Sequence, residues 1–560
     1  MPPPLLANSF GVGHFAHQVT IEVLPDDILQ NIFRHYLDVT PRFWPTLGCV
    51  CQRWRQIILA SPLGLNLRLY FTYGTPVLKT LDFWPVLPIT VQYGGFPNLD
   101  PPASEDDDNI IAALKQSDRV TSISLTVTRS LLEKISAISD PLLELEELAL
   151  LSRDDVQLTL PNIFRWGSSL CTLHLTRVGF PSFPQLLSPC HDLVDLQLHE
   201  IPSAGYFSPE AFANALSGMT QLRTVSFHFL SFPHRRSFLS LPPPPGERIL
   251  LPALTRLKYR GVSKYLDSLA GRIDAPHLGD IDITFFSQPT MDASQLGQFI
   301  ERVGLQAPRS RADVQISAHA ISITNASSSS PLRLHISCKQ LDWQLSCMAQ
   351  VCHQLSPLLF PVENLGINTI EWPSGHDGVD DEQWLELVLA FSGARDFRVT
   401  GEVATRILRA FPPADASNVT VLPALRHICV EDLMAISEPS WNALQESRRI
   451  SGHPVELQGL CHICNAATNA DFNRMQGLRK HLVDEHAYRV VCSYCGGFEC
   501  KPTQRHLFRE HIASKHPEVA RNDALISGPI TYSSQLQRLV NRHSSLRAPG
   551  MVAPSTTAMA

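Results

Sequence analysis

The feature that most constrains this chain is a short apolar pattern that returns along much of its length. Apolar residues occupy its first, fourth and sixth positions, as at Leu145, Leu148 and Leu150. The pattern starts at Val120, Leu145, Leu170, Leu193, Leu222, Leu254 and Leu278. Successive starts are 25, 25, 23, 29, 32 and 24 residues apart. One such unit cannot bury its apolar side chains alone, so the repetition predicts stacked units around a continuous core, a solenoid.

The spacing also selects the class of solenoid. It is the period of leucine-rich repeats and not of tetratricopeptide, ankyrin or propeller repeats. Each unit is expected to supply one short strand and a returning helix or loop, which makes the fold class α/β. The asparagine that usually follows the leucine pattern is absent, and Thr176, His199 and His228 stand near its place. We therefore expect an irregular leucine-rich-repeat solenoid.

The array is interrupted once and then resumes. Between Ala312 and Cys338, alternating apolar runs flank a serine-rich turn at residues 325–331, which predicts a hairpin. The pattern returns at Val362, Ala394 and Leu425. We expect the solenoid to span residues 63–455.

Residues 21–62 predict two amphipathic helices ahead of the array. The first opens with Pro25 followed by two aspartates, which suits a helix N-terminus. The second is expected from Phe43 to Leu59, until Ser61 and Pro62 end it. Forty residues are too few to bury a core, so their apolar faces are expected to need a second protein. The alternative is a helical hairpin that caps the array.

Two strings in this segment carry a resemblance. Leu24-Pro25-Asp26-Asp27-Ile28-Leu29 and Val50-Cys51-Gln52-Arg53-Trp54-Arg55 resemble an F-box, the motif by which substrate receptors dock on the Skp-type adaptor of cullin–RING ubiquitin ligases. The resemblance implies an F-box over residues 19–62 and an adaptor-binding surface. The residues implied to contact the adaptor are Leu24, Pro25, Ile28, Leu29, Ile32, Phe33, Leu47, Val50, Cys51 and Trp54.

A wider resemblance covers roughly residues 20 to 455. Its strings are Leu67-Arg68-Leu69, Tyr73-Gly74-Thr75-Pro76-Val77, Trp84-Pro85, Asp342-Trp343-Gln344-Leu345-Ser346, Gln350-Val351-Cys352, Val421-Leu422-Pro423-Ala424-Leu425 and Ser451-Gly452-His453-Pro454. Together they resemble an expanded family of F-box/leucine-rich-repeat proteins from mushroom-forming fungi. That resemblance implies a substrate-receptor architecture without an activity of its own.

Composition limits the other classes of function. A net charge of −7 over 560 residues gives the whole chain no electrostatic signature of a nucleic-acid or membrane-surface binder. The sequence shows neither a signal peptide nor a membrane-spanning run, so we expect a cytoplasmic or nuclear protein. No nucleophile elbow, phosphate loop or other catalytic spacing stands out, and the protein is not expected to be an enzyme.

Residues 456–520 carry a different signal, two sets of metal-ligand spacing. Cys461 and Cys464 are followed after sixteen residues by His481 and His486, and Cys492 and Cys495 after fifteen by His511 and His516. Two thiolates on a turn and two histidines on one helix face can close a tetrahedron around zinc. We expect two ββα-like zinc fingers with one structural zinc ion each. Cys500 and His506 are rival ligands in the second finger.

The fingers leave a second function open. Residues 461–520 contain eight lysines and arginines against six aspartates and glutamates, whereas duplex binding rests on neutralising many phosphates. A protein-binding or structural role is therefore favoured over nucleic acid, although a nucleic-acid-binding regulator is the alternative for the whole chain. A third reading is an F-box protein that acts without the ligase. Residues 1–18 and 521–560 are expected to be flexible or disordered.

The leading prediction is a substrate-receptor subunit of a cullin–RING ubiquitin ligase. Its F-box helices would dock the Skp-type adaptor, and its repeat face would bind an unidentified client protein.

Overall fold

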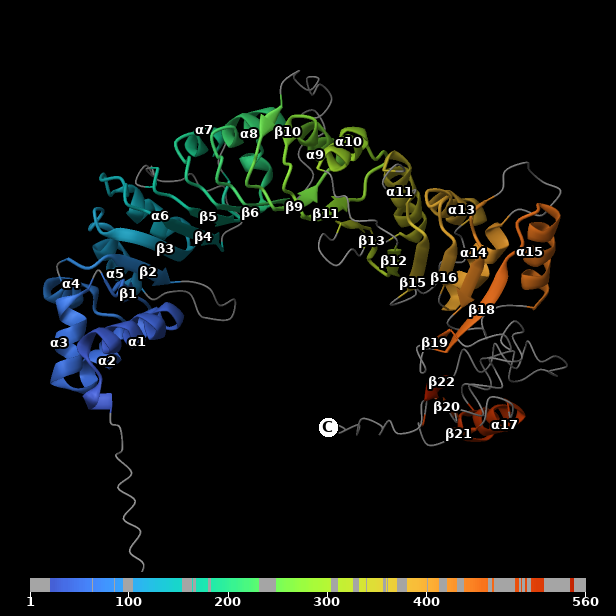
Figure 1. Ribbon diagram of the computed structural model, residues 1–560, viewed down its shortest axis with the longest axis horizontal. Helices are drawn as coiled ribbons and strands as arrows, with labels where there is room; N and C mark the ends of the chain where they lie inside the picture. Colours follow the sequence, from blue (N-terminus) through green and yellow to red (C-terminus); the bar gives the residue numbers. More distant parts are fainter. Residues whose placement is uncertain are drawn as a thin grey trace, which may run out of the picture. The chain divides into compact units, whose positions relative to one another are not determined.

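The computed structural model is a mixed α/β protein in which helices precede a long series of parallel strands (Figure 1). It describes residues 21–62, 64–84, 86–93, 104–153, 164, 168–179, 183–230, 248–303, 311–325, 332–338, 340–355, 359, 361–369, 380–399, 401–411, 421–430, 438–461, 466–467, 489–492, 495, 499–500, 505–517 and 544–547. The chain divides into two compact units, residues 1–175 and 176–560. Residues 1–18, the proline run at 242–245 and Cys464, His481 and His486 lie outside the described residues.

The first unit joins a small helical group to the first strands of the array. Its elements are η1 (Ile21–Val23), α1 (Asp26–Val39), η2 (Pro41–Phe43), α2 (Trp44–Val50), α3 (Gln52–Ala60), β1 (Leu69–Phe71), α4 (Val77–Phe83), β2 (Ile89–Tyr93), α5 (Ser104–Leu114), β3 (Val120–Val127), α6 (Arg129–Ser136), β4 (Glu147–Ser152) and β5 (Thr172–Thr176), the last straddling the boundary. Strands β1 to β4 pair in sequence order and all run parallel. Their helices lie along one side of this sheet (Figure 1).

The second unit continues the same arrangement of strand and returning segment. Its elements up to the last parallel strand are α7 (Phe183–Leu187), β6 (Asp195–Ile201), η4 (Ser203–Gly205), α8 (Pro209–Leu216), β7 (Thr224–Phe229), β8 (Ile249–Leu250), β9 (Arg256–Gly261), α9 (Ser263–Ala270), β10 (Ile273–Asp274), β11 (Asp280–Phe286), α10 (Ser294–Arg302), β12 (Arg311–Ser317), β13 (Ala320–Asn325), β14 (Leu332–Ser337), α11 (Leu341–Gln354), β15 (Asn364–Thr369), α13 (Asp381–Leu389), β16 (Asp396–Val399), α14 (Gly401–Ala410), β17 (His427–Val430), α15 (Glu438–Ile450) and β18 (Glu456–Cys461).

The leucine pattern explains where the core lies. Every apolar position of the pattern in the described repeats is at most 3% exposed, from Val120 to Val430. Alternate side chains of each strand therefore point into the core, and the residues between them form a polar face. The predicted solenoid with a continuous apolar core is confirmed.

The predicted hairpin is part of the sheet. β12 and β13 pair antiparallel, as do β13 and β14. β14 is parallel to β11, and β12 is parallel to β15, so the sheet order is β11-β14-β13-β12-β15. The three inserted strands bridge the repeats on either side without a break in hydrogen bonding.

The sheet also extends past the expected end of the solenoid. β18 pairs parallel with β17 from Glu456 to Gly459, beyond residue 455. A short strand, β19 (Ala466–Ala467), then pairs antiparallel with the end of β18. Cys461, expected to belong to a zinc finger, is thus the last residue of an array strand.

The C-terminal part contains a small three-stranded sheet and one described helix. Its elements are β20 (Arg489–Cys492), β21 (Glu499–Cys500), α17 (Arg505–Lys515) and β22 (Ser544–Arg547). β20 pairs antiparallel with both β21 and β22. Residues 544–547, within the tail expected to be disordered, contribute the strand β22, and the rest of that tail lies outside the described residues.

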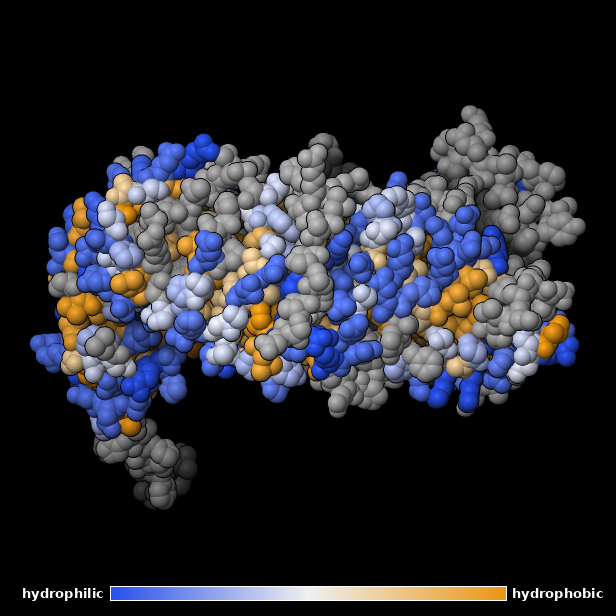
Figure 2. All heavy atoms as spheres, turned by 90° about the horizontal axis from the view of Figure 1, so that it is seen from above, coloured by the Kyte–Doolittle hydropathy of each residue, from blue (hydrophilic) through white to orange (hydrophobic). Residues whose placement is uncertain are grey.

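The face drawn in Figure 2 is mostly hydrophilic, with hydrophobic residues gathered in separate patches. Within the described residues, no helix is both long enough and apolar enough to span a membrane.

Candidate functional site

The start of α1 is held in place by a side chain from α3. Arg53 donates from Nε to Oδ1 of Asp26 at 2.9 Å, and its Nη2 donates to the same oxygen at 2.6 Å. Nη2 also donates to the carbonyl of Leu24 at 2.5 Å. Pro25 lies between these two anchors as the residue that precedes the helix. The two sequence strings that resemble an F-box are thus in direct contact.

The helices are fastened to the array by aromatic side chains. Phe33 of α1 packs on Trp54 of α3 with ring centroids 4.7 Å apart. Trp44, 6% exposed, donates its indole N–H to the carbonyl of Arg68 at 2.9 Å, just before β1. Its ring also meets that of Trp84 edge-on at 5.2 Å. The array therefore orients the helical group within the first unit.

One face of α1 is only partly covered by the described residues of the chain. Ile28, Ile32 and Tyr36 follow one another at intervals of four residues, and each is 42% exposed. Residues at this spacing lie one above the other on a helix, so the three form a continuous apolar stripe. On the neighbouring helices, Phe43 and Val50 are 53% and 60% exposed. The side chains at 28, 32 and 36 and those at 43 and 50 therefore leave exposed apolar surface on this segment.

The residues predicted to contact the adaptor differ in burial. Leu29 and Phe33 are 0% and 1% exposed and form the inner side of α1, so they support the stripe and do not belong to the free surface. Tyr36 belongs to the stripe but was absent from that set. Pro25 and Cys51 are also exposed, whereas Leu24, Leu47 and Trp54 are half-buried.

The second predicted helix is broken in two at Cys51. This residue is extended, with φ −157° and ψ 169°, and its Sγ accepts a hydrogen bond from the backbone N–H of Trp54 at 3.5 Å. Cys51 thus caps α3. Helical spacing continues across the break, which is why the apolar pattern alone predicts a single helix from Phe43 to Leu59.

The second set of predicted metal ligands forms one cluster. The ligand atoms of Cys492, Cys495, His511 and His516 all lie within 4.8 Å of one another. Sγ of Cys492 is 3.5 Å from Nε2 of His516, and Sγ of Cys495 is 3.4 Å from Nε2 of His511. Tetrahedral zinc with bonds of about 2.3 Å to sulfur and 2.0 Å to nitrogen would place such donor pairs roughly 3.5 Å apart. The residues present therefore fit a metal ion.

Local structure explains how these four ligands meet. β20 ends at Cys492, which is 1% exposed, and Cys495 follows on a turn. α17 carries His511, and the N–H of His516 still donates to the carbonyl of Ile512 as in a helix. Partial burial and the neighbouring His516 and Lys515 lower the pKa of His511. The side chains of the rival ligands Cys500 and His506 lie outside the described residues, so the choice of His511 and His516 over them stays a prediction.

The first predicted metal set is not brought together in the described part of the chain. Cys461 ends β18, and its partners Cys464, His481 and His486 lie outside the described residues. A first zinc ion at Cys461, Cys464, His481 and His486 therefore stays a prediction.

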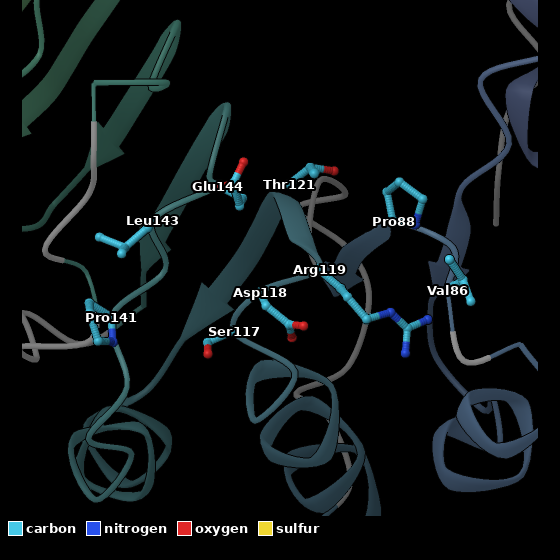
Figure 3. Close-up of a pocket in the computed structure, with 9 residues that line it drawn as sticks. All are labelled: Val86, Pro88, Ser117, Asp118, Arg119, Thr121, Pro141, Leu143 and Glu144. Atoms are coloured by element: carbon cyan, nitrogen blue, oxygen red, sulfur yellow. The ribbon is translucent and has the colours of Figure 1, made fainter. Parts of the chain in front are cut away.

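Two hollows lie among the described residues of the first unit, and neither is lined by a catalytic constellation. One, of about 410 Å³, lies beside the starts of the strands and is lined by Val86, Pro88, Ser117, Asp118, Arg119, Thr121, Pro141, Leu143 and Glu144 (Figure 3). Arg119 lines this hollow, and its guanidinium donates to the carbonyls of Trp84 and Leu87 at 2.7 and 2.8 Å. That side chain is thus engaged in joining two loops.

The other hollow lies on the polar face of the first strands, beside the C-terminal end of α1. It measures about 470 Å³ and includes Arg42, Arg68, Tyr70 and Glu147 in its lining. Burial raises the pKa of Tyr70, partly offset by the two arginines. The lining residues combine two guanidinium groups with carboxylates, which suits polar recognition and offers no activated nucleophile.

Comparison with known proteins bears on the helical segment. Residues 21–63 match the protein-family model described as F-box-like. This F-box-like segment is the one whose apolar stripe is described above. No curated protein matches the chain.

Among solved structures, the chain is similar to the leucine-rich repeat-containing protein LegL7 from Legionella pneumophila. The two are 10% identical, and the match covers 69% of this chain and 98% of that one, with a TM-score of 0.24. The solenoid assignment rests on strand register and burial and not on this neighbour.

Proposed function

We propose that this chain is a noncatalytic substrate receptor of a cullin–RING ubiquitin ligase. The F-box-like segment would dock a Skp-type adaptor, and the polar face of the array would bind a client protein. The proposal places the protein in the cytoplasm or nucleus. The observation that carries it is the exposed stripe of Ile28, Ile32 and Tyr36 within the segment that matches the F-box-like family.

The stripe has the properties of a protein contact. Full burial of an isoleucine side chain contributes about 1.5–3 kcal/mol, and each of these two isoleucines still exposes 42% of its surface. The buried layer of Leu29, Phe33 and Leu37 beneath it holds the helix in position without a partner. Docking would therefore cover a preformed surface.

The test is co-purification of the full chain with the adaptor. Ile28→Asp with Ile32→Asp should weaken binding by about 100-fold or more, because burial is lost and two carboxylates would be desolvated. The matched control is Leu78→Asp with Phe83→Asp on α4, since these side chains are also apolar and exposed, at 66% and 73%. Equal loss in both double variants, or no loss in the first, would contradict the proposal.

The Cys492, Cys495, His511 and His516 cluster is assigned a structural zinc ion. Two thiolates and two imidazoles are the donor set that tetrahedral zinc prefers. The described buried apolar residues around this cluster are Cys492 and Ile512. Because they bury little apolar surface, the ion would supply much of the folding energy of this part of the chain. We assign this unit a structural or protein-binding role.

A further inference from the structure

We propose that the polar face of strands β6 to β14 binds an extended acidic peptide segment through five side chains. These are His199, His228, Lys258, Arg260 and His335, here called the histidine–cation patch. The binding of an acidic segment is inferred from the patch itself. Only the assignment of that segment to a client protein rests on the proposed function.

Strand register brings the patch together from distant parts of the sequence. His228 of β7 lies opposite Arg260 of β9, which lies opposite Thr284 of β11, which lies opposite His335 of β14. Neighbouring strands are about 4.8 Å apart, so this row spans roughly 14 Å. Lys258 lies two residues before Arg260 and therefore on the same face of the sheet.

The patch and its surroundings carry more cations than carboxylates, although Asp282 of β11 lies opposite Lys258 in the strand register. Asp280 pairs with Arg256 at 3.0 Å and with Arg333 at 2.8 Å. Asp282 is 3.4 Å from Arg333, and Glu200 is paired with Arg177 at 2.5 Å. Among the described residues, no carboxylate forms an ion pair with Lys258 or Arg260, and Arg260 is exposed.

The histidines add hydrogen-bonding groups next to this charge. The rings of His199 and His228 stack with centroids 4.4 Å apart, and both approach the hydroxyl of Ser226, at 2.9 and 3.4 Å. The pKa of His228 is lowered to about 4, mainly because its ring is desolvated. His199, Arg260 and Lys258 lower the pKa as well, and Glu200 has a small opposing effect. The cations that disfavour a further proton at this place would favour an anion.

An acidic peptide fits these features better than a nucleic acid. Lys258 and Arg260 form no ion pair with the described carboxylates, and the chain as a whole carries a net charge of −7. Duplex binding needs many phosphate contacts, whereas two or three carboxylates of an extended segment can meet Lys258 and Arg260, which lie two residues apart on one face of β9. Charge complementarity therefore selects aspartate- and glutamate-containing protein segments.

The experiment uses the full chain and three labelled twelve-residue peptides in fluorescence anisotropy. One contains alternating glutamate and serine, the second has glutamine in place of each glutamate, and the third has lysine. Only the acidic peptide should bind, with an affinity that falls as salt rises. Lys258→Glu with Arg260→Glu should weaken its binding at least tenfold. Lys258→Gln with Arg260→Gln should give a smaller loss and guards against misfolding of the reversed variant.

The matched control is Lys264→Glu with Arg409→Glu, which makes the same charge change on exposed helix positions of the same unit. This control should leave binding within about twofold. Equal binding of the acidic and glutamine peptides, equal loss in the control, or tighter binding of a twelve-base-pair duplex than of the acidic peptide would each overturn the inference. Adaptor co-purification is a separate measurement, so failure of the proposed function would be distinguishable.

Discussion

Asp267 is a buried carboxylate that joins two consecutive repeats. It lies on α9, is 7% exposed, and accepts a hydrogen bond from the backbone N–H of Leu296 in the first turn of α10 at 2.9 Å. Desolvation raises its pKa to about 6, with a further contribution from Asp292, although the backbone N–H groups of Leu296 and Gln295 oppose the rise. Asp267 therefore caps the next helix at an electrostatic cost.

Because the folded pKa lies above the unfolded one, the folded chain keeps a proton between pH 4 and 6 that the unfolded chain has lost. The contribution of the Asp267 carboxyl to the free energy of unfolding is therefore greatest below about pH 4. It decreases by on the order of 2 kcal/mol as the pH rises to 6. Asp267→Asn keeps an acceptor without the charge, so it should raise the unfolding midpoint at pH 7.5 and leave it unchanged at pH 4. Denaturant unfolding followed by circular dichroism at both values provides the measurement.

The control for this prediction is Asp267→Ala, which removes the acceptor as well as the charge and should therefore be less stable than Asp267→Asn by about 1 kcal/mol at both pH values. A lower midpoint for Asp267→Asn than for the native chain at pH 7.5 would show that the charged form is the better cap.

For single residues, the sequence predicts burial where the spacing along a strand determines which face a side chain occupies. Leu148, Val225 and Ile281 could be placed in the core from their spacing alone, because a strand has only two faces. Leu29 and Phe33 could not be separated from Ile28 and Ile32, because all four are apolar neighbours on a helix. Which side of α1 is covered depends on Trp54 and on the rest of the chain.

Among the elements, the C-terminal sheet and α17 carry the side chains that could hold a metal ion. Its Cys and His side chains meet at one point, and β22 completes the sheet from residues some thirty positions beyond α17. The ligand spacing could be found in the sequence, because coordination fixes residue types and intervals. β22 could not, since Ser544–Arg547 offers a four-residue strand in a serine- and alanine-rich tail.

Metal removal tests this element. A chelator should remove one zinc equivalent bound by Cys492, Cys495, His511 and His516, and proteolysis should then cleave within 489–517, because the ion supplies folding energy there. Cys495→Ser should have the same effect and release that zinc equivalent, measured by mass spectrometry of the metal content. His506→Ala is the control and should retain it. Unchanged zinc content in the Cys495 variant would contradict the assignment.

Over the whole molecule, most of the array follows from sequence periodicity, and its one irregular region does not. The hairpin at residues 312–338 was predictable from alternation, but its place in the sheet was not, because alternation does not specify a strand's neighbours. α10 connects β11 to β12, and in the sheet β14 and β13 lie between these two strands. α11 connects β14 to β15, and β13 and β12 lie between those two. Gln350 and Gln354 of α11 accept hydrogen bonds from the N–H groups of Met291 and Ala293, ahead of α10.

This interlocking predicts that residues 280–369 open as one unit in the full chain. Ile323→Ala, at a position 2% exposed on β13, should speed amide hydrogen exchange across β11, β12, β14 and β15 together, because β13 links them through its neighbours. Leu196→Ala on β6 is the matched core substitution and should affect mainly its own repeat and β7. Mass spectrometry of exchanged peptides distinguishes the two patterns, and a response confined to β12 and β13 would refute the prediction.

The order β11-β14-β13-β12-β15 has a mechanical consequence. A chain pulled from its ends can shed ordinary repeats singly, since each has neighbours that are adjacent in sequence. In the region from β11 to β15, a pull from the C-terminal side reaches β15 first, and β15 is paired with β12. The strand before it in the sequence, β14, is held by both β11 and β13. Unravelling would have to disrupt several strands at once, so this region would act as a force-resistant clamp in an otherwise sequentially extensible array.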